Sequence, residues 1–176
     1  MSVVSPHGVA ATTDNTTDPT GTDATSTTDA GTDPTGTSAE LTQCLLMPVG
    51  SEWYLVDMRW LQEVVAEPTI SELPTAPGSI LGLFNLRGEI VPLFDTGVLL
   101  GLAPTASAPF ALVVETDLGP AGLAATGVPE SVPLPDPIGD SETAGGMTVH
   151  AFGDRIATLL DPTVLLSATR IGGGRP

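Results

Sequence analysis

The chain has 176 residues, and its 21 acidic side chains outnumber 5 basic ones, which gives a formal net charge of −16 at pH 7. Nucleic acids and anionic lipids bind to clustered cations, so this charge excludes a nucleic acid or a membrane surface as a binding partner. The length suffices for one domain or for two small lobes with a common core, and it excludes a large multidomain enzyme.

Residues 1–40 differ in composition from the rest of the chain. They lack Phe, Trp, Tyr, Lys and Arg, and the sequence TDPTGTDA, which starts at Thr17, returns as TDPTGTSA from Thr32. Such a segment buries too little apolar surface to offset about 1–2 kcal/mol of backbone entropy per residue. We therefore expect a disordered, acidic, solvating tail. Attachment of a partner, or phosphorylation of its threonines, is the alternative.

Short apolar stretches at close intervals begin at Leu41. They predict a strand up to Val49, a hairpin turn and a returning strand that ends at Asp57. The next segment, MRWLQEVV, predicts one or two helical turns followed by a further strand. A helix there would place Met58, Leu61 and Val65 on one face, which packs on the sheet or offers a surface to a partner.

Trp60 lies off that helical face. Aromatic side chains and arginine are enriched in the hot spots of protein interfaces. Trp60 is therefore a candidate for a partner surface.

The stretch SILGLFNLRGEIVPLFD, residues 79–95, is an apolar run with one polar interruption. Its two halves predict two strands joined by a tight hairpin turn at Arg87 and Gly88. Glycine suits this turn because it takes a positive φ without steric cost.

Asp95 or Thr96 is expected to cap a short helix over 97–102. The remainder repeats short strands with Gly and Pro turns and ends in a helical turn over 162–170. The pattern predicts about ten strands in roughly 135 residues, and therefore an all-β fold with short helices. Two small packed barrels suit this number of strands better than one sandwich.

Residues that would carry catalysis are few. His7 lies in the expected tail, and His150 stands alone in a strand pattern, where a hydrogen-bonded or exposed histidine is expected rather than a general base. No G-x-S-x-G or glycine-rich phosphate loop occurs, and IGGGRP (171–176) is interpreted as a flexible end. Asp57 and Asp95 each end an apolar strand, where a cap also belongs. We therefore expect no enzyme, no cofactor and no metal site.

Cysteine usage and hydropathy indicate the compartment. Cys44 is the single cysteine, which excludes an intramolecular disulfide and a cysteine-cluster metal site, and we expect an inert core thiol. The N-terminus lacks a signal-peptide pattern, and no apolar run approaches about 18 residues, so we expect a cytoplasmic protein.

An acidic chain without lysine also fits a protein that works in molar salt. A Debye length of about 3 Å at that salt concentration removes most self-repulsion between carboxylates. We interpret the composition as that of a halophile, with ordinary acidic bias as the alternative.

The segment ILGLFNLRGEIVPLFD followed by TGVLLGL (80–102) resembles the hairpin and helix of the CheW-like domain family of chemotaxis proteins. The upstream segments EWYLVDMRWLQEVV and ISELPTAPGSI occur at the spacing typical of the family, with Gln62 and Glu63 at its Gln-Glu position. The resemblance covers about residues 41–167 and is stronger in the first half.

This resemblance implies two packed SH3-like five-stranded barrels within residues 41–170. It implies a non-enzymatic adaptor that couples the cytoplasmic tips of methyl-accepting chemoreceptors to the regulatory domain of a CheA-type histidine kinase, in receptor arrays at the membrane. The groove between the barrels would take a receptor tip, and the barrel ends would pair with the kinase domain. The alternative is a stand-alone SH3-like module, or a reduced paralogue that competes in or caps kinase arrays without coupling.

The same resemblance assigns partner contacts to Arg87, Leu61 and Glu63. The partner-binding candidates are Arg87, Glu63, Leu61, Trp60, Asn85 and Gly88. Arg87 is expected at the outward tip of the hairpin, where its guanidinium presents donors to a carboxylate of a partner or of the neighbouring barrel. An internal salt bridge that steadies the hairpin is the alternative.

The second half of the chain departs from the family pattern. GLAATG (122–127) stands where family members tend to carry a valine-rich strand that ends in Asp. The loop between VPESVPLP and MTVHAF also looks short, and it contains Gly145 and Gly146. The resemblance therefore defines the contacts of the second barrel less closely than those of the first.

Overall fold

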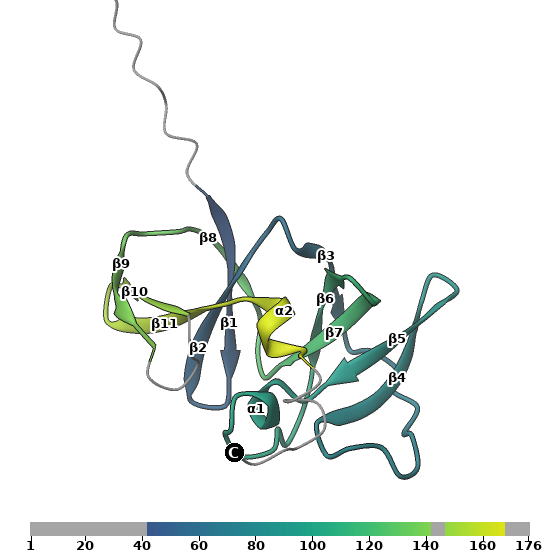
Figure 1. Ribbon diagram of the computed structural model, residues 1–176. Helices are drawn as coiled ribbons and strands as arrows, with labels where there is room; N and C mark the ends of the chain where they lie inside the picture. The colour runs from purple at the N-terminus through teal and green to yellow at the C-terminus, as the bar shows by residue number, and fades with distance from the viewer. Residues whose placement is uncertain (1–41, 142–146, 168–176) are drawn as a thin grey trace, which may run out of the picture. The chain divides into compact units, whose positions relative to one another are not determined.

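The computed structural model of the protein describes residues 42–141 and 147–167. Within these ranges the chain forms strands β1–β11 and two short helices, α1 and α2 (Figure 1). The predicted all-β class with short helices is confirmed. The predicted tail (1–40) and flexible end (171–176) lie outside the described residues, so the domain boundaries stay predictions.

One sheet has six strands in the order β8-β1-β2-β11-β10-β9. Neighbouring strands run antiparallel except β2 and β11, which pair in parallel. The sheet therefore combines an early and a late part of the chain. Its strands are β1 (Gln43–Val49), β2 (Glu52–Asp57), β8 (Glu130–Pro133), β9 (Pro137–Asp140), β10 (Thr148–Phe152) and β11 (Arg155–Leu160).

The other sheet has five strands in the order β3-β6-β7-β5-β4. All of them come from the chain between β2 and β8, and β5 pairs with β7 in parallel. This sheet is therefore inserted, as one continuous piece of sequence, between the two parts of the first. Its strands are β3 (Leu61–Ala66), β4 (Ile80–Leu86), β5 (Glu89–Phe94), β6 (Phe110–Thr116) and β7 (Gly119–Ala125).

Each sheet buries apolar side chains on both of its faces. All five strands of the second sheet contribute to one cluster around Phe84 and Val91, so this sheet curls around its own core. A matching cluster around Leu46 and Leu55 belongs to the six-stranded sheet. Side chains on the other faces, Met47 and Leu112 among them, form a third cluster that the two sheets share. Burial on both faces explains why the strands are almost continuously apolar.

The two short helices close this shared cluster. Helix α1 (Thr96–Leu99) has Asp95 as its N-cap, and helix α2 (Pro162–Leu165) has Asp161. The Asp95 carboxylate accepts hydrogen bonds from the backbone N–H of Val98 at 3.2 Å and of Thr105 at 2.8 Å. The predicted capped helix after the hairpin is therefore confirmed, with Asp95 rather than the next residue as the cap.

The helical turns predicted within 58–65 are wrong. A turn leads directly into β3 at Leu61, and β3 pairs with β6. Pairing with a neighbouring strand satisfies the backbone groups that a helix would have used, and Val64 and Val65 favour the extended form. Leu61 and Val65 consequently pack on different clusters instead of sharing one face.

The predicted number of five strands is wrong for the first sheet, because β9 adds a sixth. All four residues of β9, PIGD, are exposed, so no alternation of apolar and polar side chains marks this strand in the sequence. It forms through pairing with β10, with a register shift between Val149 and His150. Edge strands of this kind depend on a neighbour rather than on their own pattern.

Substitution of Gly82 tests the packing at the edge of β4. Gly82 has a φ of 151°, and a Cβ there would lie 2.4 Å from the backbone oxygen of Ser71. Two backbone hydrogen bonds, of 2.7 and 2.9 Å, hold Ser71 against Leu83, so this oxygen cannot withdraw freely. We expect Gly82→Ala to lower the free energy of unfolding by about 2–4 kcal/mol in urea titrations.

Gly139→Ala is the matched control, because a Cβ at Gly139 meets nothing within 4 Å. It should change the free energy of unfolding by less than about 0.5 kcal/mol. Equal losses for the two variants would contradict the packing described for Gly82.

Cys44 should react with thiol reagents only when the protein opens. Its side chain is 0% exposed, and burial, followed by the charge of Asp57, raises the pKa of its thiol to about 11. Because the thiolate is the reactive form, we expect modification at pH 8 to proceed no faster than unfolding. Since the pKa is raised from 9.0 by folding, the free energy of unfolding should fall as the pH rises from 9 toward 11. Modification at the rate of a free thiol would show that Cys44 is accessible.

Candidate functional site

The β4–β5 hairpin ends in a two-residue turn made of Arg87 and Gly88. Leu86 pairs with Glu89 across the turn, and Arg87 and Gly88 have positive φ values of 52° and 97°. The Oδ1 atom of Asn85 accepts a hydrogen bond from the Gly88 N–H at 2.9 Å, which closes the turn. The predicted tight hairpin is confirmed. Arginine in this left-handed region costs about 1–2 kcal/mol relative to an ordinary backbone conformation.

Arg87 forms an ion pair with Glu63 of β3. The Nη2 atom of Arg87 donates a hydrogen bond to Oε1 of Glu63 at 2.9 Å. The side chain of Arg87 is 79% exposed, whereas that of Glu63 is 31% exposed. The internal salt bridge considered for Arg87 is therefore present, and most of the guanidinium still faces water.

This ion pair joins the two edges of the five-stranded sheet. Glu63 lies on β3 at one edge, and Arg87 lies at the end of the β4–β5 hairpin at the other. Residues at opposite edges of a flat five-stranded sheet cannot reach each other, since neighbouring strands lie about 4.8 Å apart. The Arg87–Glu63 contact is thus a direct sign of how strongly the sheet curls.

A groove of about 710 Å³ lies between the same two edges. Val65 of β3 lines it on one side, and Leu83, Asn85 and Ile90 of the hairpin line it on the other. The side chain of Ile90 is 59% exposed. The hairpin therefore presents a charged tip next to an open, partly apolar groove.

Trp60 and Leu61 take a different position from the hairpin candidates. Both are partly buried and pack against the cluster that the two sheets share. The guanidinium of Arg59 lies 5.6 Å from the centre of the Trp60 ring and pairs with Asp57 at 3.0 Å. The structure therefore brings Arg87, Glu63, Asn85 and Gly88 together, and it places Trp60 and Leu61 at the packed start of β3.

Glu115 is a neighbour of this site that the sequence analysis missed. Gln62 donates a side-chain hydrogen bond to the Glu115 carboxylate, and the N–H of Glu115 donates to the carbonyl of Trp60 at 2.9 Å. The partners Gln62 and Glu115 lie 53 residues apart, so no local pattern links them. The only signal in the sequence is a polar residue at the end of the apolar strand FALVVET.

His150 is buried and hydrogen-bonded, so of the two expected environments the hydrogen-bonded one is present and the exposed one is not. Its Nδ1 lies 2.8 Å from the carbonyl oxygen of Pro135, which only accepts, so this nitrogen carries the proton. Its Nε2 lies 2.8 Å from the hydroxyl of Thr148 and accepts from it. Among the residues that the structure describes, no group of three or more His, Cys, Asp or Glu side chains is placed to hold a metal ion.

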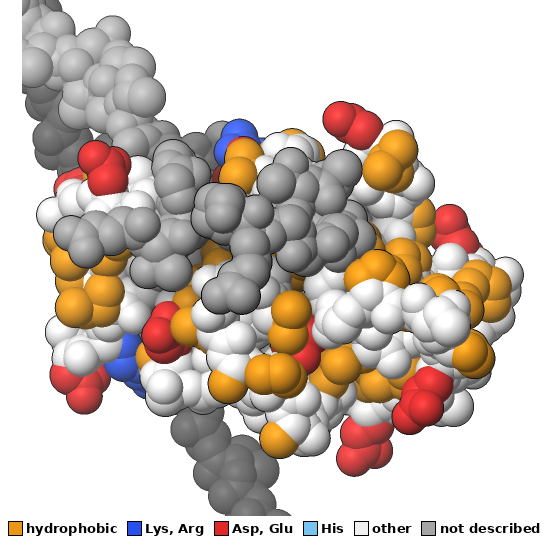
Figure 2. Space-filling model, turned by 60° about the horizontal axis from the view of Figure 1, so that its bottom comes forward, with side chains coloured by type: hydrophobic (Ala, Val, Ile, Leu, Met, Phe, Trp, Pro, Cys, Tyr) orange, Lys and Arg blue, Asp and Glu red, His pale blue; other side chains and the backbone are white. Residues whose placement is uncertain are grey.

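The described surface carries scattered charges rather than a basic patch. On the face in Figure 2, acidic side chains are spread widely and basic ones occur only as isolated spots. Within residues 42–141 and 147–167, neither helix is long and apolar enough to cross a membrane.

Fold and site together define an all-β domain in which two curled sheets share a core and a charged hairpin stands at the surface. The family model described as "CheW-like domain" matches residues 43–170, a span that includes every described strand and both helices. The chain therefore belongs to the CheW-like domain family, and the resemblance noted from the hairpin sequence is confirmed.

Curated relatives match over shorter stretches. The chemotaxis protein CheW of Treponema pallidum is 34% identical over 56 residues, which is 32% of this chain and 33% of that protein. The chemotaxis protein CheV3 of Helicobacter pylori is 37% identical over 54 residues, or 31% of this chain and 17% of that protein. The chain thus covers about a third or less of the length of these relatives.

A solved structure extends the likeness over about three quarters of the chain. The crystal structure of the scaffolding protein TtCheW from Thermoanaerobacter tengcongensis superposes with a TM-score of 0.63 at 24% sequence identity. The match covers 74% of this chain and 90% of that chain. The two proteins share a fold.

The Arg87–Glu63 pair should contribute little to stability. Because Arg87 is 79% exposed, water screens the attraction, and exposed pairs typically contribute about 0.2–1 kcal/mol. We expect a double-mutant cycle with Arg87→Ala and Glu63→Ala to give a coupling energy in that range at low salt, and less in molar salt. Urea unfolding of the four proteins measures it.

The Arg59–Asp57 pair, also highly exposed on its arginine side, is the matched control and should give a similar coupling energy. A coupling above about 2 kcal/mol for Arg87 and Glu63 alone would identify their pair as a structural brace of the curled sheet.

Proposed function

We propose that this protein is a chemotaxis adaptor that couples chemoreceptors to a CheA-type histidine kinase. The observation that carries the proposal is the CheW-like family match over residues 43–170, which includes both sheets and the Arg87 hairpin. The names of the relatives, chemotaxis protein CheW and scaffolding protein TtCheW, support it further. An adaptor of this kind acts by binding, needs no cofactor, and works at the cytoplasmic side of receptor arrays.

The hairpin tip is the partner surface in this proposal. Arg87, Asn85 and Gly88 are exposed, and Glu63 stands beside them. Because Glu63 occupies one Arg87 nitrogen and the other donors face water, the guanidinium offers a second carboxylate a planar pair of hydrogen bonds. Trp60 and Leu61 contribute by holding β3, and thus Glu63, in position.

Co-purification tests the coupling itself. The full chain should bind the regulatory domain of a CheA-type kinase and the cytoplasmic fragment of a chemoreceptor together, in the salt concentration of its source. Kinase activity controlled by the receptor in the three-component mixture would support coupling. Binding to one component without transmitted control would instead identify a competing or capping paralogue. Binding to neither would refute an adaptor role.

Arg87→Ala tests the hairpin. At an interface where the guanidinium is desolvated and hydrogen-bonded, its loss typically costs about 2–4 kcal/mol, so we expect binding to kinase or receptor to weaken at least about thirtyfold. The free energy of unfolding should change by less than about 1 kcal/mol. Calorimetric titration and urea unfolding of the same samples separate the two effects.

Arg87→Lys and Arg155→Ala are the controls. Lysine keeps the charge but not the planar pair of donors, so Arg87→Lys should recover little of the lost affinity. Arg155 belongs to the other sheet and pairs with Glu130 at 3.6 Å, so its loss should leave binding through the hairpin unchanged. Normal binding by a folded Arg87→Ala variant would exclude Arg87 from the interface.

A further inference from the structure

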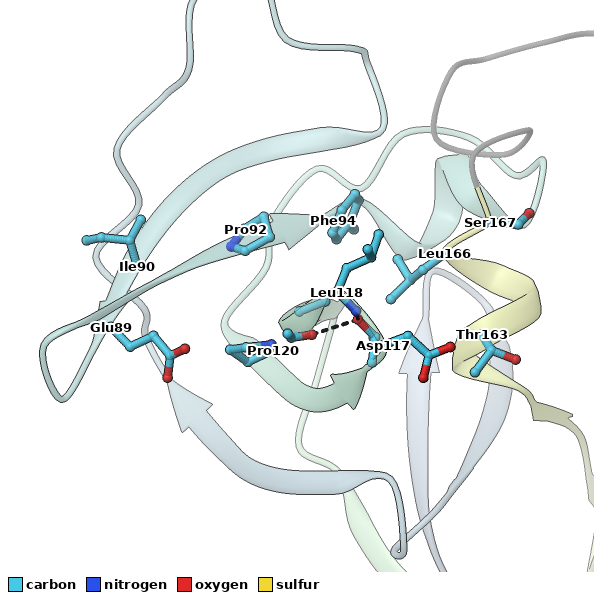
Figure 3. A pocket seen from close by; sticks show the side chains of 13 residues that line it. Glu89, Ile90, Pro92, Phe94, Asp117, Leu118, Pro120, Thr163, Leu166 and Ser167 are labelled. Carbon is cyan, nitrogen blue, oxygen red and sulfur yellow. Dashed lines mark hydrogen bonds between the residues drawn. The ribbon is translucent and has the colours of Figure 1, made fainter.

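A second groove, of about 540 Å³, lies beside α2 (Figure 3). Its walls come from β5, from the turn between β6 and β7, and from the end of α2. Pro92, Phe94, Leu118, Pro120 and Leu166 give it an apolar lining. Figure 3 shows Leu118, Phe94 and Leu166 on the same side of the groove lining.

The groove leaves large apolar side chains in water. Leu118 is 96% exposed and Ile90 is 59% exposed, and both line it. A leucine at the tip of a hairpin contributes nothing to the fold at that exposure, whereas covering it would remove its apolar surface from water. The groove at Leu118 and Leu166 can therefore bind an apolar side chain of an occupant.

Two carboxylates stand at the rim of this groove, Glu89 and Asp117. Both are exposed, and neither forms an ion pair with another described residue. An occupant that carries cations next to an apolar side chain would match the rim as well as the lining.

Cations are scarce in this chain, which narrows the choice of occupant. The sequence holds five arginines and no lysine. Arg59, Arg87 and Arg155 already pair with carboxylates elsewhere on the surface. The other two, Arg170 and Arg175, both lie in residues 168–176, outside the described residues.

The described part of the chain ends at the groove. Ser167, which directly precedes residues 168–176, is one of the groove's lining residues. Ile171 comes four residues later, and an extended chain spans about 3.3–3.6 Å per residue, so Ile171 can lie up to about 14 Å from Ser167. Arg170 and Ile171 are adjacent, which places a cation next to an apolar side chain as the groove requires.

We propose that residues 168–176 dock into the groove beside α2, with Ile171 against Leu118 and Leu166 and with Arg170 and Arg175 beside Asp117 and Glu89. The docked segment covers an apolar surface that would otherwise be open to a partner.

A second copy of the chain fits the groove less well. Each copy carries a formal charge of −16 and presents the same two rim carboxylates, so close approach places like charges together. Attachment to Ser167 also gives the segment a high effective concentration at the groove, which a separate molecule lacks.

A spin label placed by Pro176→Cys tests the docking in the full chain. Cys44 stays unmodified because its thiol is completely buried, so the label attaches only to the new cysteine. We expect strong paramagnetic broadening of the methyl signals of Leu118, Ile90 and Leu166. The measurement uses neither kinase nor receptor, so its result is independent of the proposed coupling function.

Variants distinguish docking of residues 168–176 in the groove from proximity that results only from their covalent link to Ser167. Ile171→Asp, or Leu118→Asp on the other side of the contact, should reduce the ratio of docked to free segment by about tenfold or more, and most of the broadening with it. Arg170→Gln with Arg175→Gln should reduce the broadening at low salt and have less effect in molar salt. Ile138→Asp is the matched control, because Ile138 is 60% exposed and lies on β9 of the other sheet.

Three results would overturn the proposal. Broadening that survives Ile171→Asp would mean that the segment lies near the groove only because it is attached there. Broadening of isotope-labelled protein by spin label on a separate, unlabelled copy would assign the groove to a second molecule. Absence of broadening in the parent chain would leave the groove without this occupant.

Discussion

Strand β6 is buried on both of its faces, and this constraint holds the two sheets in one domain. Leu112 and Val114 enter the cluster that the sheets share, whereas Ala111 and Val113 enter the cluster inside the five-stranded sheet. All four side chains are 0% exposed. Because side chains alternate along a strand, separating the sheets or flattening the second one would bring one of these two rows into water. The curl that lets Arg87 meet Glu63 is a consequence of the same packing.

The turn at Arg87 combines a local cost with a long-range contact. A positive φ of 52° suits Asn or Gly better than Arg, so the hairpin would be steadier with another residue. Arginine alone supplies a permanent, planar cation that spans the edges of the sheet and still faces water. Backbone strain of this kind clusters at functional sites in proteins.

Features set by neighbouring residues were predictable from the sequence, and features set by distant residues were not. The Arg87–Gly88 turn and the Asp95 cap depend on a few consecutive residues, so their chemistry is visible in the sequence. Residue Leu61 begins a strand rather than continuing a helix because β6, some fifty residues later, supplies its hydrogen-bond partners. The contact of Arg87 with Glu63 spans 24 residues of sequence, so no local pattern shows it, although each residue is by itself a candidate for partner binding.

The order in which the chain contributes strands to the two sheets implies an order of folding. Residues Leu61–Ala125 form the five-stranded sheet by themselves, so its pairings close comparatively short loops. The parallel pairing of β2 with β11 joins Trp53 to Ala157 and can form only after the intervening chain has become compact. We therefore expect the five-stranded sheet to fold first, as the nucleus. The six-stranded sheet, whose strands come from early and late parts of the chain, then forms against it. During synthesis, β1 and β2 emerge before the other strands and can pair with each other, but their outer neighbours β8 and β11 are made much later. The open edges of this apolar hairpin are therefore the part of the domain most in need of protection from aggregation.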